Sequence, residues 1–178
     1  FQAETREKER KQVYYMSMEF LVGTSLHNNL FNLGLYNEAD EVLTELGFSL
    51  PKLCEMEPDA GLGNGGLGRL ASCYMDAATG LCYPVTGFSI RYEFGIFKQK
   101  IVDGWQIEFP DDWLGLGDVW LHTREDDAVE VRFGGTVHEW MDHGKFKAAQ
   151  VGYQSVMAVP HDFYISGYHS DSANKLTL

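Results

Sequence analysis

Five glycines crowd the twelve residues from Glu57 to Gly68, and an amphipathic pattern begins at once behind them. From Leu67 to Ala78 apolar residues recur at helical spacing, and Gly80 marks the expected helix end. A helix N-terminus presents unpaired N–H groups and the positive end of the helix dipole, and glycines let a ligand approach the backbone closely. The segment therefore predicts a site for a phosphate or a sugar at the start of this helix.

Three other interpretations of the glycines can be weighed from the residues. Gly61, Gly63 and Gly66 match the dinucleotide pattern GxGxxG, but that pattern should follow a hydrophobic strand, and "LCEMEPDA" precedes it here. A P-loop needs Lys followed by Ser or Thr, whereas Arg69 stands near that place and no hydroxyl follows it. A purely structural loop, whose glycines serve only tight turns, stays open.

Charge and composition narrow the function classes. The 178 residues are 44% hydrophobic and carry a formal net charge of −12, with a pI near 4.8, which argues against a general nucleic-acid binder. No apolar run is long enough for a membrane span. Three cysteines without a CxxC pair favour free thiols in a reducing compartment, so we expect a cytoplasmic protein.

Hydrophobic periodicity predicts an α/β fold with added antiparallel hairpins. A buried strand is expected over residues 13–20, with the carboxylate of Glu19 near its end, and a helix over residues 37–46. Alternation over residues 87–97 predicts a strand in which Arg91 and Glu93 can pair with each other or with another polar group. Gly134-Gly135 between alternating residues predicts a hairpin turn.

Several strings, taken in order and spacing, resemble one enzyme family. The resemblance is to the N-terminal domain of the α-glucan phosphorylases, which act on glycogen, starch or maltodextrin, and it runs from about Lys11 to the end of the chain. The strings that carry it are "VYYMSMEFLVG", "NLGL", "DAGLGNGGLGRLASCYMD", "IRYEFGIFKQKIVDGWQ", "DDWL" and "AVP" before "SGY". The chain is thus expected to be residues 1–178 of a longer enzyme, part of its N-terminal domain.

The resemblance implies a fold and a reaction. It implies the Rossmann-like N-terminal half of a GT-B glycosyltransferase, with the active site in a cleft between two such domains. The family releases the terminal glucose of an α-1,4-glucan with inorganic phosphate, giving glucose 1-phosphate with retention of configuration. Its pyridoxal 5'-phosphate acts through the cofactor phosphate. A homodimer is also expected, with glucan and inorganic phosphate as partners and no nucleic acid or membrane.

The resemblance also assigns residues by matching position. Asn64, Gly65, Gly66 and Leu67 match the segment that lines the catalytic cleft. The amides of Gly65 and Gly66 are expected near the substrate or cofactor phosphate, with Asn64 on the cofactor side, and Leu67 is expected at the glucosyl unit. Glu19 matches an acid near the same cleft and is expected to be a polar residue on the cofactor side.

Other basic residues receive weaker roles or none. Arg69 is expected either to supplement the anion site or to pair with a carboxylate. The lysine that attaches the cofactor belongs to the family's C-terminal domain, and its pattern is matched by none of Lys98, Lys100, Lys145 and Lys147. This chain alone is therefore expected to be inactive.

Two rival functions remain at the level of sequence. The first is a noncatalytic carbohydrate- or phosphate-binding module with the same fold, which a natural stop near Leu178 would favour. The second is a dinucleotide-binding oxidoreductase, which predicts saturable NAD binding; the lack of a strand directly before the glycine loop argues against it.

Overall fold

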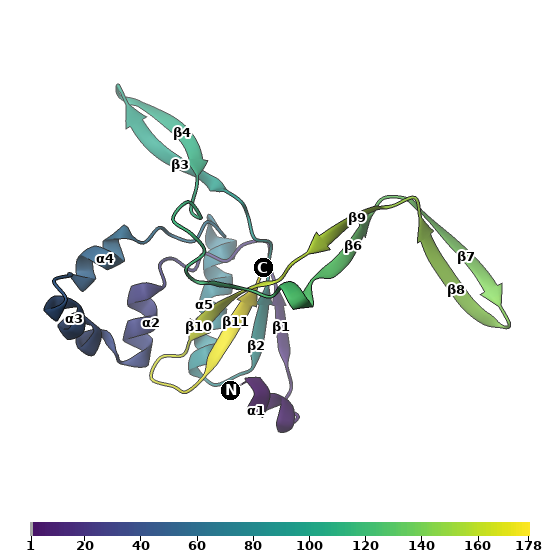
Figure 1. The fold of residues 1–178 in the computed structure, drawn as a ribbon, viewed down its shortest axis with the longest axis horizontal. Helices are drawn as coiled ribbons and strands as arrows, with labels where there is room; N and C mark the ends of the chain where they lie inside the picture. Colours follow the sequence, from purple (N-terminus) through teal and green to yellow (C-terminus); the bar gives the residue numbers. More distant parts are fainter. Residues whose placement is uncertain (1) are drawn as a thin grey trace. The chain divides into compact units, whose positions relative to one another are not determined.

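The computed structural model describes residues 2–178, and its centre is a mixed five-stranded sheet with helices (Figure 1). The strand order is β1-β2-β11-β10-β5. β1 pairs with β2 and β2 with β11 in parallel, whereas β10 and β11 are antiparallel. These elements are β1 (Val13–Met16), β2 (Val85–Phe88), β5 (Leu121–Thr123), β10 (His161–Ser166) and β11 (Ala173–Thr177). The α/β prediction is confirmed.

Five helices lie in the first half of the chain. They are α1 (Gln2–Glu7), α2 (Leu26–Leu33), α3 (Tyr36–Glu45), α4 (Leu50–Met56) and α5 (Gly66–Gly80). The predicted helices over residues 37–46 and 67–80 are thus confirmed as α3 and α5. α5 packs on one face of the sheet against β2, β10 and β11 (Figure 1).

The core lies between α5 and this sheet. Its largest fully buried apolar side chains include Phe20, Leu62, Met75 and Leu176. Asn174 is also fully buried, and its side-chain amide is satisfied because it donates to Thr79 Oγ1 (3.0 Å) and accepts from the N–H of Val85 (3.1 Å). The amide therefore ties the end of α5 to the start of β2.

Two predicted strands differ from the structure. β1 ends at Met16, so Glu19 lies beyond it, and the strand is an exposed edge and not a buried one. The strand expected over residues 87–97 is split into β2 and β3, with no strand over residues 89–94. Side-chain hydrogen bonds hold residues 89–94 in place. Tyr92 Oη donates to the carbonyl of Met18 (2.8 Å), and Trp113 Nε1 donates to the carbonyl of Tyr92 (3.1 Å).

The predicted hairpin turn at Gly134-Gly135 is wrong. β6 (Val129–Phe133) pairs with β9 (Gln154–Ala158), and β7 (Thr136–Asp142) pairs with β8 (Lys145–Val151). The chain reverses instead at His143-Gly144, where both residues have positive φ. Asp103 and Gly104 also have positive φ, and they form the turn between β3 (Gly95–Val102) and β4 (Trp105–Asp111). Gly134 and Gly135 interrupt a longer two-stranded ladder.

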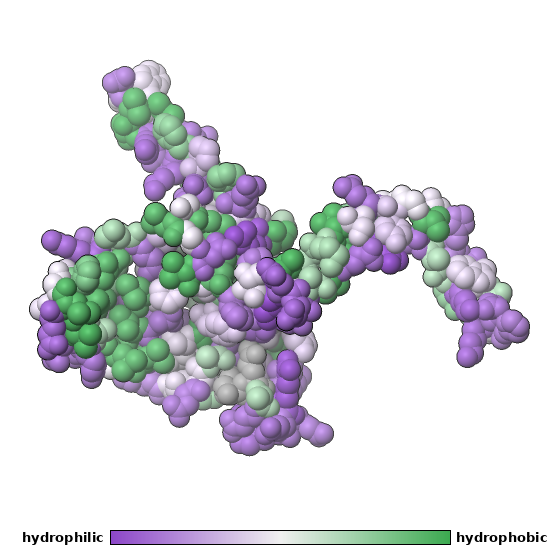
Figure 2. Space-filling model, viewed as in Figure 1, coloured by the Kyte–Doolittle hydropathy of each residue, from purple (hydrophilic) through white to green (hydrophobic). Residues whose placement is uncertain are grey.

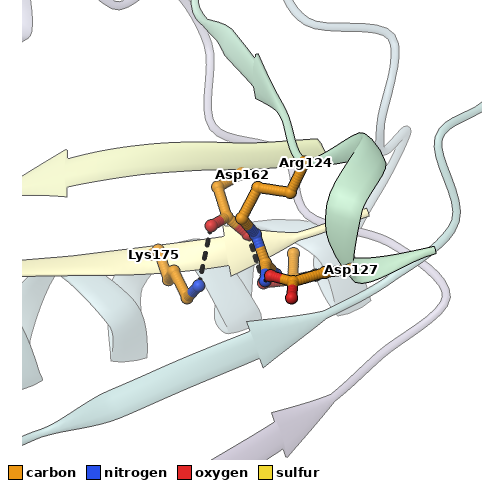
Figure 3. Close-up of polar contacts among 5 residues, drawn as sticks. Arg124, Asp127, Asp162 and Lys175 are labelled. Atoms are coloured by element: carbon orange, nitrogen blue, oxygen red, sulfur yellow. Dashed lines mark hydrogen bonds and ion pairs between the residues drawn. The ribbon is translucent and has the colours of Figure 1, made fainter. Parts of the chain in front are cut away.

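The chain divides into two compact units. One comprises the residues up to His122 together with His161–Leu178, and it contains the whole buried core cluster. The other, Thr123–Pro160, contains β6 to β9 and the short 3₁₀ helix η1 (Glu125–Asp127). Arg124, which directly precedes η1, forms an ion pair with Asp127 (Figure 3).

Candidate functional site

The glycine loop leads directly into α5, as predicted. Gly65 is the N-cap residue, with extended backbone (φ −146°) and no side chain to cap the helix. In the described part of the chain, no acceptor receives a hydrogen bond from the N–H groups of Gly66 and Leu67. Such first-turn amides need a partner from solvent, from another part of a protein or from a ligand.

Two glycines of the loop are packed against the backbone that follows β1. A Cβ built on Gly63 would lie 2.8 Å from the backbone nitrogen of Leu21, and one built on Gly68 would lie 3.1 Å from the same atom. Backbone hydrogen bonds hold this contact, from Phe20 N to Leu62 O (2.8 Å) and from Leu21 N to Gly68 O (3.0 Å). These glycines are required by close packing.

Two other glycines face open space. A Cβ on Gly65 or Gly66 would have no atom within 4 Å. Packing does not explain why these positions lack a side chain. An open backbone at a helix N-terminus suits the approach of an anion, and it lies beyond the carboxyl end of β1, where α/β sheets commonly bind ligands.

Glu19 lies beside this helix start. Its Cβ and Oε2 are 3.0 and 3.2 Å from the Cβ position built on Gly68, and its side chain is half-buried. The structure thus brings Glu19 to the first turn of α5, close to Gly65 and Gly66. A carboxylate here would repel a fully charged anion unless a proton or a cation intervenes.

Asn64, Leu67 and Arg69 complete the predicted set. Asn64 is exposed, and Leu67 is 59% exposed. Arg69 Nη1 donates to the carbonyl of Leu21 (3.3 Å) and forms no ion pair with a carboxylate within residues 2–178. Its guanidinium therefore supports the chain after β1.

Arg91 forms an ion pair, but not with Glu93. Its Nη2 lies 2.8 Å from Oδ2 of Asp118. The pairing with Glu93 fails because residues 89–94 are not a strand, so the two side chains do not share a strand face. The contact instead ties the irregular segment after β2 to the loop before β5.

A small polar groove lies between α2, α5 and β10. Its volume is about 130 Å³, and Arg69, Ser72 and Asp76 line it from α5. Asp76 is exposed as a residue, but partial burial of its carboxyl raises the pKa of that group, and the charge of Arg69 partly opposes the shift. The groove therefore disfavours the charged carboxylate.

A larger, apolar cavity lies elsewhere. It has a volume of about 450 Å³ and an apolar lining that includes Leu53, Trp113 and Trp120, and it does not include Asn64 to Leu67.

In residues 2–178, no group of three or more His, Cys, Asp or Glu could hold a metal ion. Nor does any helix in that range combine the length and apolar character that crossing a membrane requires.

One anchoring residue was missed by the sequence interpretation. Glu57 accepts hydrogen bonds from the backbone N–H of Ser25 (2.6 Å) and of Leu26 (2.9 Å), so it caps α2 from a distant segment. No local pattern signals a cap supplied 31 residues away.

The structure also argues against the dinucleotide-binding alternative. That pattern requires a strand directly before the glycine loop, and α4 precedes the loop instead.

Comparison of the sequence with known proteins identifies a matching family and several relatives. The family model described as carbohydrate phosphorylase matches residues 43–178. The chain is 46% identical over 172 residues to the brain form of glycogen phosphorylase from Homo sapiens, covering 97% of this chain and 20% of that protein. It is 48% identical over 169 residues to glycogen phosphorylase from Chlamydia pneumoniae (94% and 20%) and 46% over 179 residues to that from Bacillus subtilis (98% and 22%). The chain thus spans about a fifth of the length of these curated relatives.

Proposed function

Because this chain belongs to the carbohydrate phosphorylase family, we propose that it forms part of a glycogen phosphorylase that releases glucose 1-phosphate from an α-1,4-glucan and inorganic phosphate. The observation that carries the proposal is the identity of 46% over 97% of the chain to a protein named glycogen phosphorylase. The proposed fold is the N-terminal half of a GT-B glycosyltransferase, which accords with the parallel strands and covering helix of the sheet.

In this proposal the open part of the glycine loop binds phosphate. The amides of Gly65 and Gly66 donate to a phosphate oxygen of the substrate or cofactor, Asn64 lies beside them on the cofactor side, and Leu67 contacts the glucosyl unit. The open space at Gly65 and Gly66 supports this role, as does the exposure of Leu67. Backbone donors fixed before the reaction stabilise developing negative charge because they need no reorganisation.

Glu19 is proposed as a polar residue on the cofactor side of the same cleft. Its position against the first turn of α5 supports this role.

Pyridoxal 5'-phosphate is the proposed cofactor. The open N-terminus of α5 fits a phosphate group, and Gly65 and Gly66 would contribute amides to it. When bound, the cofactor supplies a phosphate that exchanges a proton with the substrate phosphate. The family pattern around the attachment lysine does not occur in this sequence, so that lysine is expected outside this chain, and neither Lys98 and Lys100 in β3 nor Lys145 and Lys147 in β8 are proposed for it. The chain alone is expected to be inactive.

The remaining assignments follow from the same proposal. We expect a cytoplasmic homodimer that uses a glucan and inorganic phosphate and has no nucleic-acid partner. The net charge of −12 supports the last point, because binding to a phosphate backbone relies on clustered Lys and Arg.

The test compares two variants of the natural polypeptide that contains these residues. Phosphate-dependent release of glucose 1-phosphate from a maltooligosaccharide is measured with pyridoxal 5'-phosphate present. Gly66→Leu keeps the backbone N–H but fills the open space in front of it, so it should block the approach of the phosphate and lower kcat by about 100-fold or more, comparable to the loss of one preorganised donor. Gly80→Leu is the matched control, because Gly80 lies at the other end of α5 and also faces open space.

The outcomes separate the two candidate functions. Activity in the wild type and in Gly80→Leu, but not in Gly66→Leu, would support the glycine loop as half of an active site. A folded, cofactor-loaded wild type that binds glucan yet releases no glucose 1-phosphate would favour the noncatalytic module instead.

A further inference from the structure

Glu19 lies on irregular chain, yet its side chain has a defined place. β1 ends at Met16, and its pairing with β2 does not extend to Glu19, so no strand ladder fixes the direction of this carboxylate. Its Oε2 nevertheless lies 3.2 Å from the Cβ position built on Gly68, in the first turn of α5. Other contacts must therefore hold the backbone at Glu19.

The peptide group between Met18 and Glu19 is held by side chains at both of its polar atoms. The carbonyl of Met18 accepts a hydrogen bond from Tyr92 Oη (2.8 Å), and the N–H of Glu19 donates to Ser17 Oγ (3.2 Å). A peptide group is planar, so two such bonds fix the orientation of the whole plane. The Ser17 bond is local, whereas Tyr92 reaches Met18 from 74 positions later in the chain.

The peptide group on the other side of Glu19 is held by the glycine loop. The N–H of Phe20 donates to the carbonyl of Leu62 (2.8 Å), and Phe20 is fully buried. The two peptide planes that flank a residue set its φ and ψ, and so the direction of its side chain. Both planes are held at Glu19, and only the first of them depends on side-chain hydrogen bonds.

Trp113 places Tyr92 relative to the glycine loop. Its indole is 7% exposed, and its Nε1 donates to the carbonyl of Tyr92 (3.1 Å). The same indole packs on the loop, because a Cβ built on Gly61 would lie 2.9 Å from Trp113 Cγ. One large, rigid side chain therefore contacts both the loop and the segment that holds Met18.

We propose that Tyr92 is a positioning residue for Glu19. Its hydroxyl fixes the Met18–Glu19 peptide group so that the Glu19 carboxyl lies at the first turn of α5, close to Gly65 and Gly66. Tyr92 acts through Glu19 and is not proposed to contact phosphate or glucan. The inference rests on the proposed function, since it assumes that Glu19 acts in the cleft at the start of α5.

The first test measures kinetics in the natural polypeptide loaded with pyridoxal 5'-phosphate. Tyr92→Phe removes only the hydroxyl, and kcat for phosphorolysis of a maltooligosaccharide should fall by about 10-fold or more, because small misplacements of an active-site group slow the reaction steeply. The KM for the maltooligosaccharide should stay unchanged, because the contacts with the glucan remain. Tyr83→Phe is the matched control, because Tyr83 is 60% exposed and loses the same hydroxyl.

A double-mutant cycle asks whether Tyr92 acts through Glu19. Glu19→Gln removes the charge that Tyr92 is proposed to position. If the two residues act as one unit, adding Tyr92→Phe to Glu19→Gln should cause no further loss of kcat. A role of Tyr92 in general stability would instead lower kcat by the same factor in both backgrounds.

The second test does not depend on activity. Hydrogen exchange is followed at the single amides of Glu19 and of Ala71, which is fully buried in α5. Tyr92→Phe releases the Met18 carbonyl, so the Glu19 amide should exchange at least about 10-fold faster, whereas Ala71 should keep its rate because the opening is local. Tyr83→Phe should change neither rate.

Each result decides the proposal. Faster exchange at Glu19 alone, with a kcat loss that disappears in Glu19→Gln, supports it. Unchanged exchange at Glu19, equal acceleration at Ala71, additive kcat losses or a Glu19→Gln variant with the wild-type kcat would overturn it. A wild type that releases no glucose 1-phosphate would contradict the proposed function, and the exchange rate of the Glu19 amide would still decide whether Tyr92 holds this peptide group.

Discussion

The glycines of the loop divide into two groups at the scale of single residues. Gly63 and Gly68 lack a side chain because residues 19–21 occupy that space, whereas Gly65 and Gly66 face open space. The sequence predicted a loop that exposes its backbone to an anion, but five closely spaced glycines could not reveal this division. It depends on a contact with residues more than 40 positions earlier in the chain.

The packed group leads to a stability prediction. Gly68→Ala places a methyl group 3.0 Å from Glu19 Cβ and 3.1 Å from the Leu21 nitrogen, so the chain after β1 must shift. We expect overpacking to lower the free energy of unfolding by about 1–3 kcal/mol. The higher helix propensity of alanine offsets part of this loss. Urea denaturation measures the change. Gly80→Ala, in the same helix but facing open space, should not destabilise, and an equal loss in both variants would contradict the packing argument.

A second residue-scale prediction concerns Asp76. Burial raises the pKa of its carboxyl in the folded chain above the value of about 3.9 in an unfolded chain. Because the folded state then holds its proton more tightly, this group lowers the free energy of unfolding as the pH rises through the two pKa values. Above both values Asp76→Asn should be more stable than the wild type.

The pH dependence distinguishes this effect from a change in packing. The stability difference between Asp76→Asn and the wild type should vanish as the pH falls below about 3.9. Thermal midpoints measured from pH 7 downwards test this. A difference that stays constant across the titration would show that charge at Asp76 is not its cause.

At the scale of elements, local pattern predicted some segments and failed at others. α3 and α5 follow from apolar spacing within the helix itself, so a short window contains the whole signal. Gly134-Gly135 has the positive φ values of a hairpin turn, yet the partner of β6 is β9, so the error is one of strand pairing and not of local geometry. Glycine content alone cannot choose among several possible turns.

α2 depends on a cap from a distant segment, which leads to a third prediction. Both oxygens of the Glu57 carboxylate accept amide hydrogens at the α2 N-terminus, from Ser25 and Leu26. Glu57→Ala should lower the free energy of unfolding by about 1–2 kcal/mol, since it removes a charged N-cap. Glu55→Ala is the matched control, because Glu55 is exposed in the neighbouring helix. Urea denaturation of both variants should separate them, and equal stabilities would argue against the cap.

A buried ion pair joins the antiparallel end of the sheet. Asp162 of β10 is 1% exposed, and its carboxylate accepts hydrogen bonds from Lys175 Nζ (2.7 Å) and from Thr177 Oγ1 (2.7 Å), both on β11 (Figure 3). The pair requires the register of β10 with β11. Register depends on pairing across the sheet, so local alternation could not predict it.

At the scale of the whole molecule, part of the exposed surface is apolar. Apolar side chains contribute to it, including those gathered over α3 and α4 (Figure 2), where Val42 and Leu46 are 56% and 65% exposed. The sequence could not predict this, because helical spacing gives one apolar stripe without saying what covers it.

The two units lead to a prediction about independent folding. The buried core cluster lies within the unit that contains the sheet, and residues 123–160 contribute no side chain to it. The two ends of the smaller unit meet, because the N–H of Arg124 donates to the carbonyl of Pro160 (2.9 Å). A short Gly-Ser connection can therefore replace residues 125–159 in the natural polypeptide without moving β5 or β10.

Excision should leave the larger unit folded. Its protection against hydrogen exchange in β2, α5 and β11 should remain within about 1 kcal/mol of that in the intact polypeptide, because no core contact is removed. A matched control replaces Met75, in the core, with Ala, which should lower protection in all three elements by about 2–5 kcal/mol. If excision lowers protection as much as Met75→Ala does, the smaller unit is part of the folding core. If only the control does so, the larger unit folds without β6 to β9.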